Sequence, residues 1–226
     1  NLETNISEEG VGKPNTQKNW RFNAPLESLE LLSKVGINIV NLGNNHTMDY
    51  GKDGLLNQIA LLSENDIKYF GAGENLNEAS KPLILEKYDT KIALIGFNDA
   101  EPLYSSAKTN SPGTAPFNKT DNKNAINSAV ENSDILIVSA HSGTEGSTKK
   151  NSKQQDYYHN YIDWEADLVI GHHPHVAQEI EKYKEKMIYY SLGNFVFETG
   201  ERELYKKALA VEVIIDTETK SIKEVN

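Results

Sequence analysis

Two hydrophobic periods alternate along the chain. Leucines three or four positions apart predict an amphipathic helix that begins near Pro25 and ends at Gly36. Short apolar runs rich in Val and Ile, each followed by polar turn residues, predict strands. The predicted helices span residues 24–35, 51–65, 121–132 and 157–164. The predicted strands span residues 37–42, 68–71, 82–88, 91–97, 133–140, 168–170, 186–192 and 208–215.

This alternation of strands and helices predicts an α/β fold. The strands at 82–88 and 91–97 are separated only by Asp89 and Thr90, so we expect them to pair antiparallel. Strands joined through helices pair parallel, and the sheets should therefore be mixed. No linker divides the sequence, which predicts a single domain over residues 1–226. Residues 98–122 are rich in Ser, Thr, Asn and Pro and are predicted to form a long loop.

Composition narrows the chemistry that the chain can support. Its net charge is −10, which argues against nucleic acid as the main partner. The chain has no cysteine, so metal ligands must come from His, Asp, Glu, Asn or water. No apolar run reaches the roughly 18 residues of a membrane span, and we recognise no signal peptide.

Three histidines follow one predicted strand within four residues. His172, His173 and His175 come directly after the apolar run 168–170, and Pro174 stiffens the turn. Ligands of open α/β sheets bind at the carboxyl ends of strands, and imidazole is a common metal ligand. The alternative is a polar turn with one buried, hydrogen-bonded histidine. Three imidazoles at one strand end favour a metal site.

Further His and Asn residues follow other predicted strands. They are Asn45, His46, His141 and Asn194. Asn45 offers a carbonyl oxygen as a ligand, although Asn is also a common turn residue. Asp49 either orients the His46 imidazole or caps the helix that begins near residue 51, and we favour the cap. Glu145 either points back to the site or is a solvated loop carboxylate.

Five spaced segments carry a resemblance to a known family. They are residues 1–4 (NLET), 41–51 (NLGNNHTMDYG), 141–145 (HSGTE), 171–178 (GHHPHVAQ) and 190–197 (YSLGNFVF). Together they resemble the bacterial capsule synthesis proteins of the CapA/PgsA type, associated with poly-γ-glutamate capsules. That family is similar to the calcineurin-like metallophosphoesterases. The resemblance implies a four-layer α-β-β-α sandwich with two mixed sheets and two divalent metal ions, for which the available ligands favour Mn, Fe or Zn.

The resemblance also implies roles for individual residues. The expected metal ligands are Glu3, Asn45, His141, His173 and His175. His46 is the expected catalytic residue, in contact with the reacting phosphate. The expected supporting residues around the ligands are Asp49, Glu145, His172 and Asn194.

The sequence departs from the family pattern in two places. The family begins with a strand that carries Gly-Asp, and this sequence starts after that point, so we expect the first sheet strand and one ligating Asp to be absent. Ser142 follows His141 where the family usually has Trp. Both departures bear on whether this chain is a complete catalyst.

Two functions remain open on these grounds. The first is a metal-dependent hydrolase of a phosphoester or related bond within capsule synthesis. The second is a non-catalytic component that binds polyglutamate or the membrane synthase subunits during assembly or export. Either role implies a location on the extracellular face of a bacterial membrane, with an anchor outside this sequence.

Overall fold

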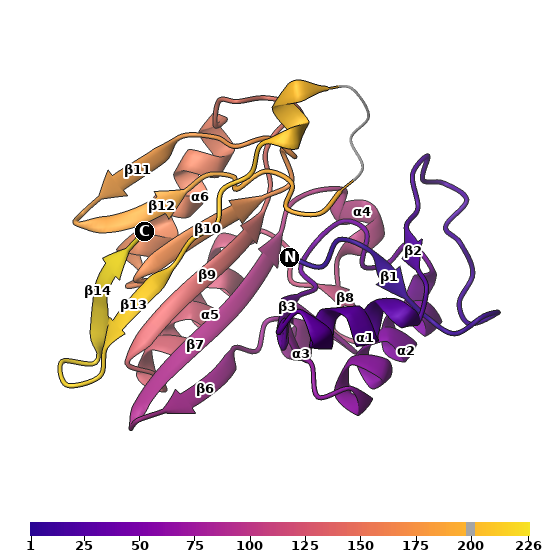
Figure 1. Cartoon of the computed structure of the whole chain (residues 1–226), viewed down its shortest axis with the longest axis horizontal. Helices are drawn as coiled ribbons and strands as arrows, with labels where there is room; N and C mark the ends of the chain where they lie inside the picture. The colour runs from indigo at the N-terminus through magenta and orange to yellow at the C-terminus, as the bar shows by residue number, and fades with distance from the viewer. Residues whose placement is uncertain (198–201) are drawn as a thin grey trace. The chain divides into compact units, whose positions relative to one another are not determined.

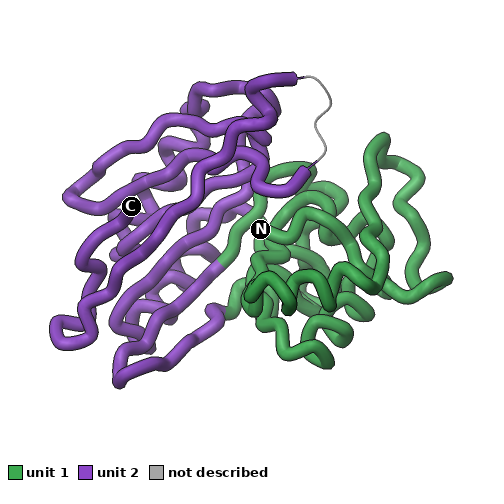
Figure 2. The backbone as a smooth tube through the Cα atoms, viewed as in Figure 1, with its two compact units in different colours: residues 1–81, 96–116 green, residues 82–95, 117–226 purple. Residues whose placement is uncertain are grey.

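The structure is a computed structural model that describes residues 1–197 and 202–226. The chain forms two compact units, coloured separately in Figure 2. Unit 1 contains residues 1–81 and 96–116, and unit 2 contains residues 82–95 and 117–226. Helices and strands alternate in both, which confirms the predicted α/β fold class. A single domain over residues 1–226 stays a prediction.

Unit 2 is built on a mixed six-stranded sheet (Figure 1). Its order is β11 (Ile180–Tyr183), β12 (Lys186–Tyr189), β10 (Leu168–His172), β9 (Ile135–His141), β7 (Thr90–Asn98) and β6 (Leu83–Lys87). The three strands β9, β10 and β12 run parallel, while β6 pairs antiparallel with β7 and β11 with β12. The mixed pairing confirms the prediction for this sheet.

The β6–β7 hairpin follows from its turn residues. Tyr88 and Asp89 both have positive φ, at 51° and 55°. Two consecutive residues of positive φ belong to the tight turn that matches the twist of paired strands. The predicted antiparallel pair is therefore confirmed, with the turn one residue earlier than the sequence indicated.

Two helices cover one face of this sheet, α5 (Lys119–Glu131) and α6 (Ser152–Asp163) (Figure 1). The sequence placed the start of α6 at residue 157, and this was wrong by five residues. Asn151 and Gln154 form a reciprocal capping box that starts the helix earlier. Buried tyrosines fill the space beneath α6, where the rings of Tyr158 and Tyr190 stack at 5.2 Å.

The C-terminal part of unit 2 contains a 3-10 turn, η1 (Glu203–Lys206), and the antiparallel hairpin β13 (Val213–Asp216) and β14 (Ser221–Val225). The predicted strand 208–215 is shorter than expected, and β11 and β14 were not predicted. Both unpredicted strands contain charged residues with few apolar positions, so their sequences lack a strong strand signal.

Unit 1 has short ladders around a separate apolar core. Its elements are β1 (Asn5–Ile6), β2 (Asn23–Ala24), α1 (Glu27–Lys34), β3 (Ile39–Asn41), α2 (Gly51–Glu64), β4 (Lys68–Phe70), β5 (Ala72–Gly73), α3 (Leu76–Ala79), α4 (Pro102–Ser105) and β8 (Gly113–Thr114). The strands pair as β1–β2, β3–β4 and β5–β8. The fully buried core side chains include Ile6, Leu42, Leu55 and Leu62. Helices α1 and α2 and strand β3 match the predicted ones closely.

The segment 98–122 is not the open loop that its composition predicted. It contains α4, β8 and the start of α5. The buried Asn98 side chain organises it, because its Nδ2 donates to the Ala100 carbonyl at 3.0 Å and to Ser105 Oγ at 2.8 Å. The hydrogen bonds of one polar side chain thus order this segment, and no apolar pattern in the sequence predicts that order. Among the described residues, no helix is long and apolar enough to cross a membrane.

Candidate functional site

The histidines of unit 2 gather at the carboxyl ends of two neighbouring strands. His141 is the last residue of β9 and His172 the last of β10, and the parallel register places them opposite one another. The chain then turns through His173 and His175. The ring centroids of His141 and His173 lie 4.9 Å apart, and those of His173 and His175 lie 6.2 Å apart. Within unit 2, the imidazoles therefore lie together at this end of the strands, as the sequence predicted.

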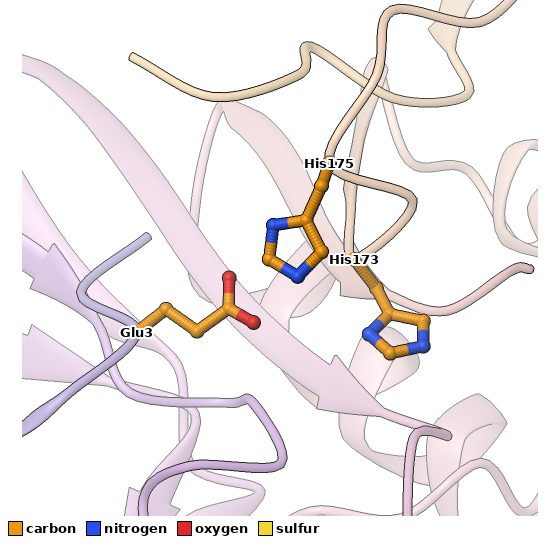
Figure 3. Close-up of side chains that lie close together, drawn as sticks. All are labelled: Glu3, His173 and His175. Carbon is orange, nitrogen blue, oxygen red and sulfur yellow. The ribbon is translucent and has the colours of Figure 1, made fainter. Parts of the chain in front are cut away.

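The turn that carries these imidazoles has an unusual backbone. His173 has φ of 99° and His175 has φ of 59°, values that L residues rarely adopt. Each such residue costs on the order of 1–3 kcal/mol unless its surroundings hold it. Pro174 between them is buried against Gly143, where an added Cβ would lie 2.9 Å from Pro174 Cγ. Figure 3 shows the His173 and His175 side chains leaving this turn.

Of the three predicted supporting residues of unit 2, Asn194 contacts a candidate ligand, His172 ends strand β10 beside the ligands, and Glu145 is exposed. Asn194 Oδ1 lies 2.9 Å from His175 Nδ1. His172 is half-buried; burial lowers its pKa well below the usual value, which keeps the ring neutral. Glu145 is exposed, which fits the solvated loop carboxylate rather than a group that points back to the imidazoles.

In unit 1, Asn45 and His46 follow β3 in a tight turn. Asn44 Oδ1 accepts a hydrogen bond from the His46 backbone N–H at 3.0 Å, which is the local turn chemistry of Asn. The His46 ring is buried, and its Nδ1 lies 2.7 Å from Asp49 Oδ2. The turn therefore fixes both the backbone and the ring of His46.

Asp49 is a partner of His46 and not a helix cap, so the preferred reading of the sequence was wrong. The N-cap of α2 is Tyr50, which makes no side-chain cap hydrogen bond. Asp49 is fully buried, and its Oδ2 also accepts the Phe22 backbone N–H at 2.8 Å. Its oxygens are engaged by these groups and by Lys18, which leaves it turned away from the helix end.

A buried lysine that the sequence did not single out completes this network. The side chain of Lys18 is 2% exposed and pairs with Asp49 and with Glu101 Oε2, the latter at 2.9 Å. Its Nζ also donates to the Asn45 carbonyl at 2.7 Å. Glu101 Oε2 accepts from Asn45 Nδ2 at 3.3 Å. Lys18 lies in a polar stretch without periodicity, so no local signal distinguishes it from a surface lysine.

Glu3 occupies the N-terminal segment of unit 1, drawn with its carboxylate in Figure 3. Leu2 N donates to the Asn41 carbonyl and Leu2 O accepts from Asn44 Nδ2, both at 2.9 Å. These bonds hold the segment against the end of β3. Within unit 1, the structure thus brings Glu3 to the same strand end as Asn45 and His46. Ligation of one metal centre by residues of both units stays a prediction.

The donor groups suit a hard or borderline divalent ion. Unit 2 provides three imidazoles, and unit 1 provides a carboxylate and an amide. Imidazole suits Zn and Fe, and carboxylate or carbonyl oxygen suits Mn, whereas thiolate is absent from the chain. The residues present therefore fit the predicted class of metal.

Solved structures share this fold. The chain superposes on the sulfate thiohydrolase SoxB of Thermus thermophilus with a TM-score of 0.56 and 12% identity, over 88% of this chain and 33% of that one. It superposes on a 5'-nucleotidase precursor from Thermus thermophilus with a TM-score of 0.53 and 12% identity, over 89% and 40%. The chain therefore shares the fold of these two solved structures.

Sequence comparison then identifies the family. Residues 1–199 match the profile of the bacterial capsule synthesis protein PGA_cap, and the chain belongs to this family. The chain is 34% identical over 187 residues to the capsule biosynthesis protein CapA of Bacillus anthracis, covering 81% of this chain and 46% of that protein. It is 35% identical over 175 residues to the PGA biosynthesis protein CapA of Bacillus subtilis, covering 77% and 46%. The chain thus spans about half the length of these relatives.

Proposed function

We propose that the chain acts in the synthesis of a poly-γ-glutamate capsule as a metal-dependent hydrolase of a phosphoester or related bond. The observation that carries this proposal is the gathering of His141, His173 and His175 at two adjacent strand ends, in a fold shared with hydrolases. Membership of the capsule synthesis family supports the process, and the imidazole cluster supports the chemistry.

In this proposal, His141, His173 and His175 hold metal in unit 2, and Glu3 and Asn45 supply ligands from unit 1. We propose two ions, of Mn, Fe or Zn. Such ions would polarise a phosphoryl oxygen and lower the pKa of a bound water.

The chain's own residues supply the proton chemistry at His46. The Asp49 carboxylate can only accept a hydrogen bond, so the neutral His46 ring carries its proton on Nδ1. Its Nε2 is then the atom that accepts a proton from, or when protonated returns one to, the reacting oxygen. The contact with the Phe22 ring, 4.2 Å between centroids, fixes the plane of the imidazole.

A non-catalytic role in capsule assembly is the second candidate, and the name of a further relative supports it. A relative from Mycobacterium tuberculosis, 26% identical over 207 residues, is called a probable polyglutamine synthesis accessory protein. An accessory protein would bind the polymer or the membrane synthase subunits without turnover. Because the chain carries a net charge of −10, an anionic polymer would bind at a local site rather than across the surface.

Either role leads us to propose a location on the extracellular face of the bacterial membrane. Cleavage of the protein in intact cells by added protease would support this location, and full protection would contradict it.

Metal content and turnover of an aryl phosphate test the first proposal. The purified chain, supplied with Mn, Fe or Zn, should retain near-stoichiometric metal and hydrolyse the ester. His173→Ala should lose both, whereas His159→Ala should lose neither, because His159 hydrogen-bonds Glu181 on β11 instead of lying at the strand ends. A matching loss in Asn45→Ala would support ligands from unit 1.

The two roles give different results. Wild-type protein without metal or turnover, but with measurable binding of poly-γ-glutamate, would overturn the hydrolase and favour the accessory role.

A further inference from the structure

The ligand candidate His175 is linked to a distant stretch of chain through one amide. Asn194 Oδ1 lies 2.9 Å from His175 Nδ1, and Asn194 Nδ2 donates to the Tyr205 carbonyl at 3.2 Å. Tyr205 belongs to η1, which lies outside the residues that match the family profile. All three residues are in unit 2.

These contacts determine where the proton on His175 lies. A backbone carbonyl can only accept, so the Asn194 atom that faces Tyr205 must be the NH₂ group. The atom that faces His175 is therefore the amide oxygen, which also only accepts. His175 Nδ1 must then donate, and in the neutral ring the lone pair lies on Nε2.

We propose that Asn194 is a positioning residue that holds His175 in the Nδ1–H tautomer, so that Nε2 is the metal-ligating atom. Partners of this kind fix the tautomer and orientation of ligating histidines in metalloproteins. The metal part of this inference rests on the proposed function, whereas the tautomer does not.

Residues around η1 contact the segment that carries Asn194. Leu209 N donates to the Leu192 carbonyl at 2.8 Å, and Gly193 bridges Ala208. The Tyr205 hydroxyl packs against Gly146, where an added Cβ would lie 2.6 Å from it. These contacts hold the segment that carries the Tyr205 carbonyl, and this carbonyl positions the Asn194 amide that faces His175.

The positive φ of His175 makes this support necessary. At φ of 59° the residue has a backbone conformation that L residues rarely adopt and that the surrounding structure must hold. A hydrogen bond at Nδ1 selects one ring orientation among those that the turn permits. Precise ligand placement needs this kind of restraint.

The tautomer can be measured directly in metal-free protein. Long-range ¹H–¹⁵N correlation spectra distinguish a protonated Nδ1 from a protonated Nε2, and His175→Ala assigns the signals among the six histidines. We expect protonated Nδ1 in the wild type. Asn194→Asp keeps an acceptor for His175 but loses the donor to the Tyr205 carbonyl, so it should keep the Nδ1–H tautomer only in part. Asn194→Ala should show a mixture of both tautomers.

Binding of Mn²⁺ or Zn²⁺ by calorimetry gives the second readout. Asn194→Ala should lose about 10–100-fold in affinity, the usual effect of removing such a partner. Asn194→Asp should lose less than Asn194→Ala, because an acceptor for His175 Nδ1 remains. Thermal unfolding of each variant confirms that it is folded.

The outcomes separate this inference from the proposed function. A wild-type His175 protonated at Nε2, or an Asn194→Ala protein that keeps the Nδ1–H tautomer and its full metal affinity, would overturn the positioning role. A wild-type protein that shows the expected tautomer but binds no metal would support the positioning of the ring and overturn the metal centre.

Discussion

His46 and Asp49 form a buried pair, with Nδ1 and Oδ2 2.7 Å apart. The three-residue spacing allows both side chains to project from one tight turn. Lys18 then approaches the same carboxylate from a different segment of unit 1. A neutralised carboxylate beside a histidine is an arrangement that orients the ring without leaving a buried charge unpaired.

Removing the buried cation should destabilise the protein strongly. Lys18→Met leaves Asp49 as an uncompensated buried charge, which costs about 3–5 kcal/mol in the free energy of unfolding. Urea unfolding measures the loss. The matched control is Lys34→Met, whose partner Glu30 is exposed, and it should cost no more than about 1 kcal/mol. Equal effects of the two substitutions would show that the Lys18 network contributes little.

Loss of the His46 imidazole should separate catalysis from metal binding. If the proposed hydrolase is correct, His46→Gln lowers turnover of an aryl phosphate by about 10²–10⁴-fold, the usual contribution of a positioned acid or base. Metal content should stay at the wild-type level, because His46 is not among the proposed ligands. A parallel loss of metal would instead make His46 a ligand.

The positive φ of His173 should lower the stability of the protein. Glycine accepts the φ of 99° without strain, whereas alanine does not. The free energy of unfolding of His173→Gly should therefore exceed that of His173→Ala by about 1 kcal/mol or more, although both variants lack the imidazole. Chemical denaturation of the pair isolates the backbone effect. If the alanine variant proves the more stable, the turn is not strained.

Glu181 should make stability depend on acid pH. Burial raises its pKa, but hydrogen bonds from Tyr190 and His159 outweigh that effect and hold the pKa below its ordinary 4.5. The ionised Glu181 therefore stabilises the fold above about pH 4.5, and this contribution is lost as the pH falls through the lowered pKa. Unfolding free energies of wild type and Glu181→Gln should differ at pH 7 and converge in acid.

Tyr190→Phe is the matched control for that experiment. It removes one of the two hydrogen bonds to Glu181, so its pH dependence should lie between those of wild type and Glu181→Gln. A Glu181→Gln protein with an unchanged pH profile would show that this carboxylate does not couple to folding.

A methyl group at Gly171 should disrupt the end of β10. An added Cβ would lie 2.0 Å from the Tyr190 carbonyl oxygen, which belongs to backbone and cannot move aside. Gly171→Ala should cost about 1–3 kcal/mol or more through overpacking. Calorimetric unfolding of Gly171→Ala against the wild type measures the loss, and an unchanged melting temperature would contradict the predicted clash.

The sequence predicted the α/β fold, most helices and the histidine cluster because each depends on local chemistry. Apolar periodicity places α2 within one residue, and His172, His173 and His175 lie close together because they are near neighbours in sequence at the end of β10. Asp49 was misread because a carboxylate before a helix is usually a cap, and only the approach of Lys18 reverses that preference. The order within 98–122 was missed because the buried Asn98 side chain, and not an apolar pattern, creates it.

The bond from Asn194 to the carbonyl of Tyr205 has a consequence for how this family varies. A main-chain acceptor is present whatever side chain stands at position 205. Substitutions at position 205 should therefore keep the hydrogen bond from Asn194. A deletion that shifts the backbone by one residue would move the accepting carbonyl away from the amide. Natural relatives should accordingly vary in residue type around η1 but keep the number of residues between η1 and Asn194. The support of His175 should therefore be recognised by this spacing rather than by residue identity.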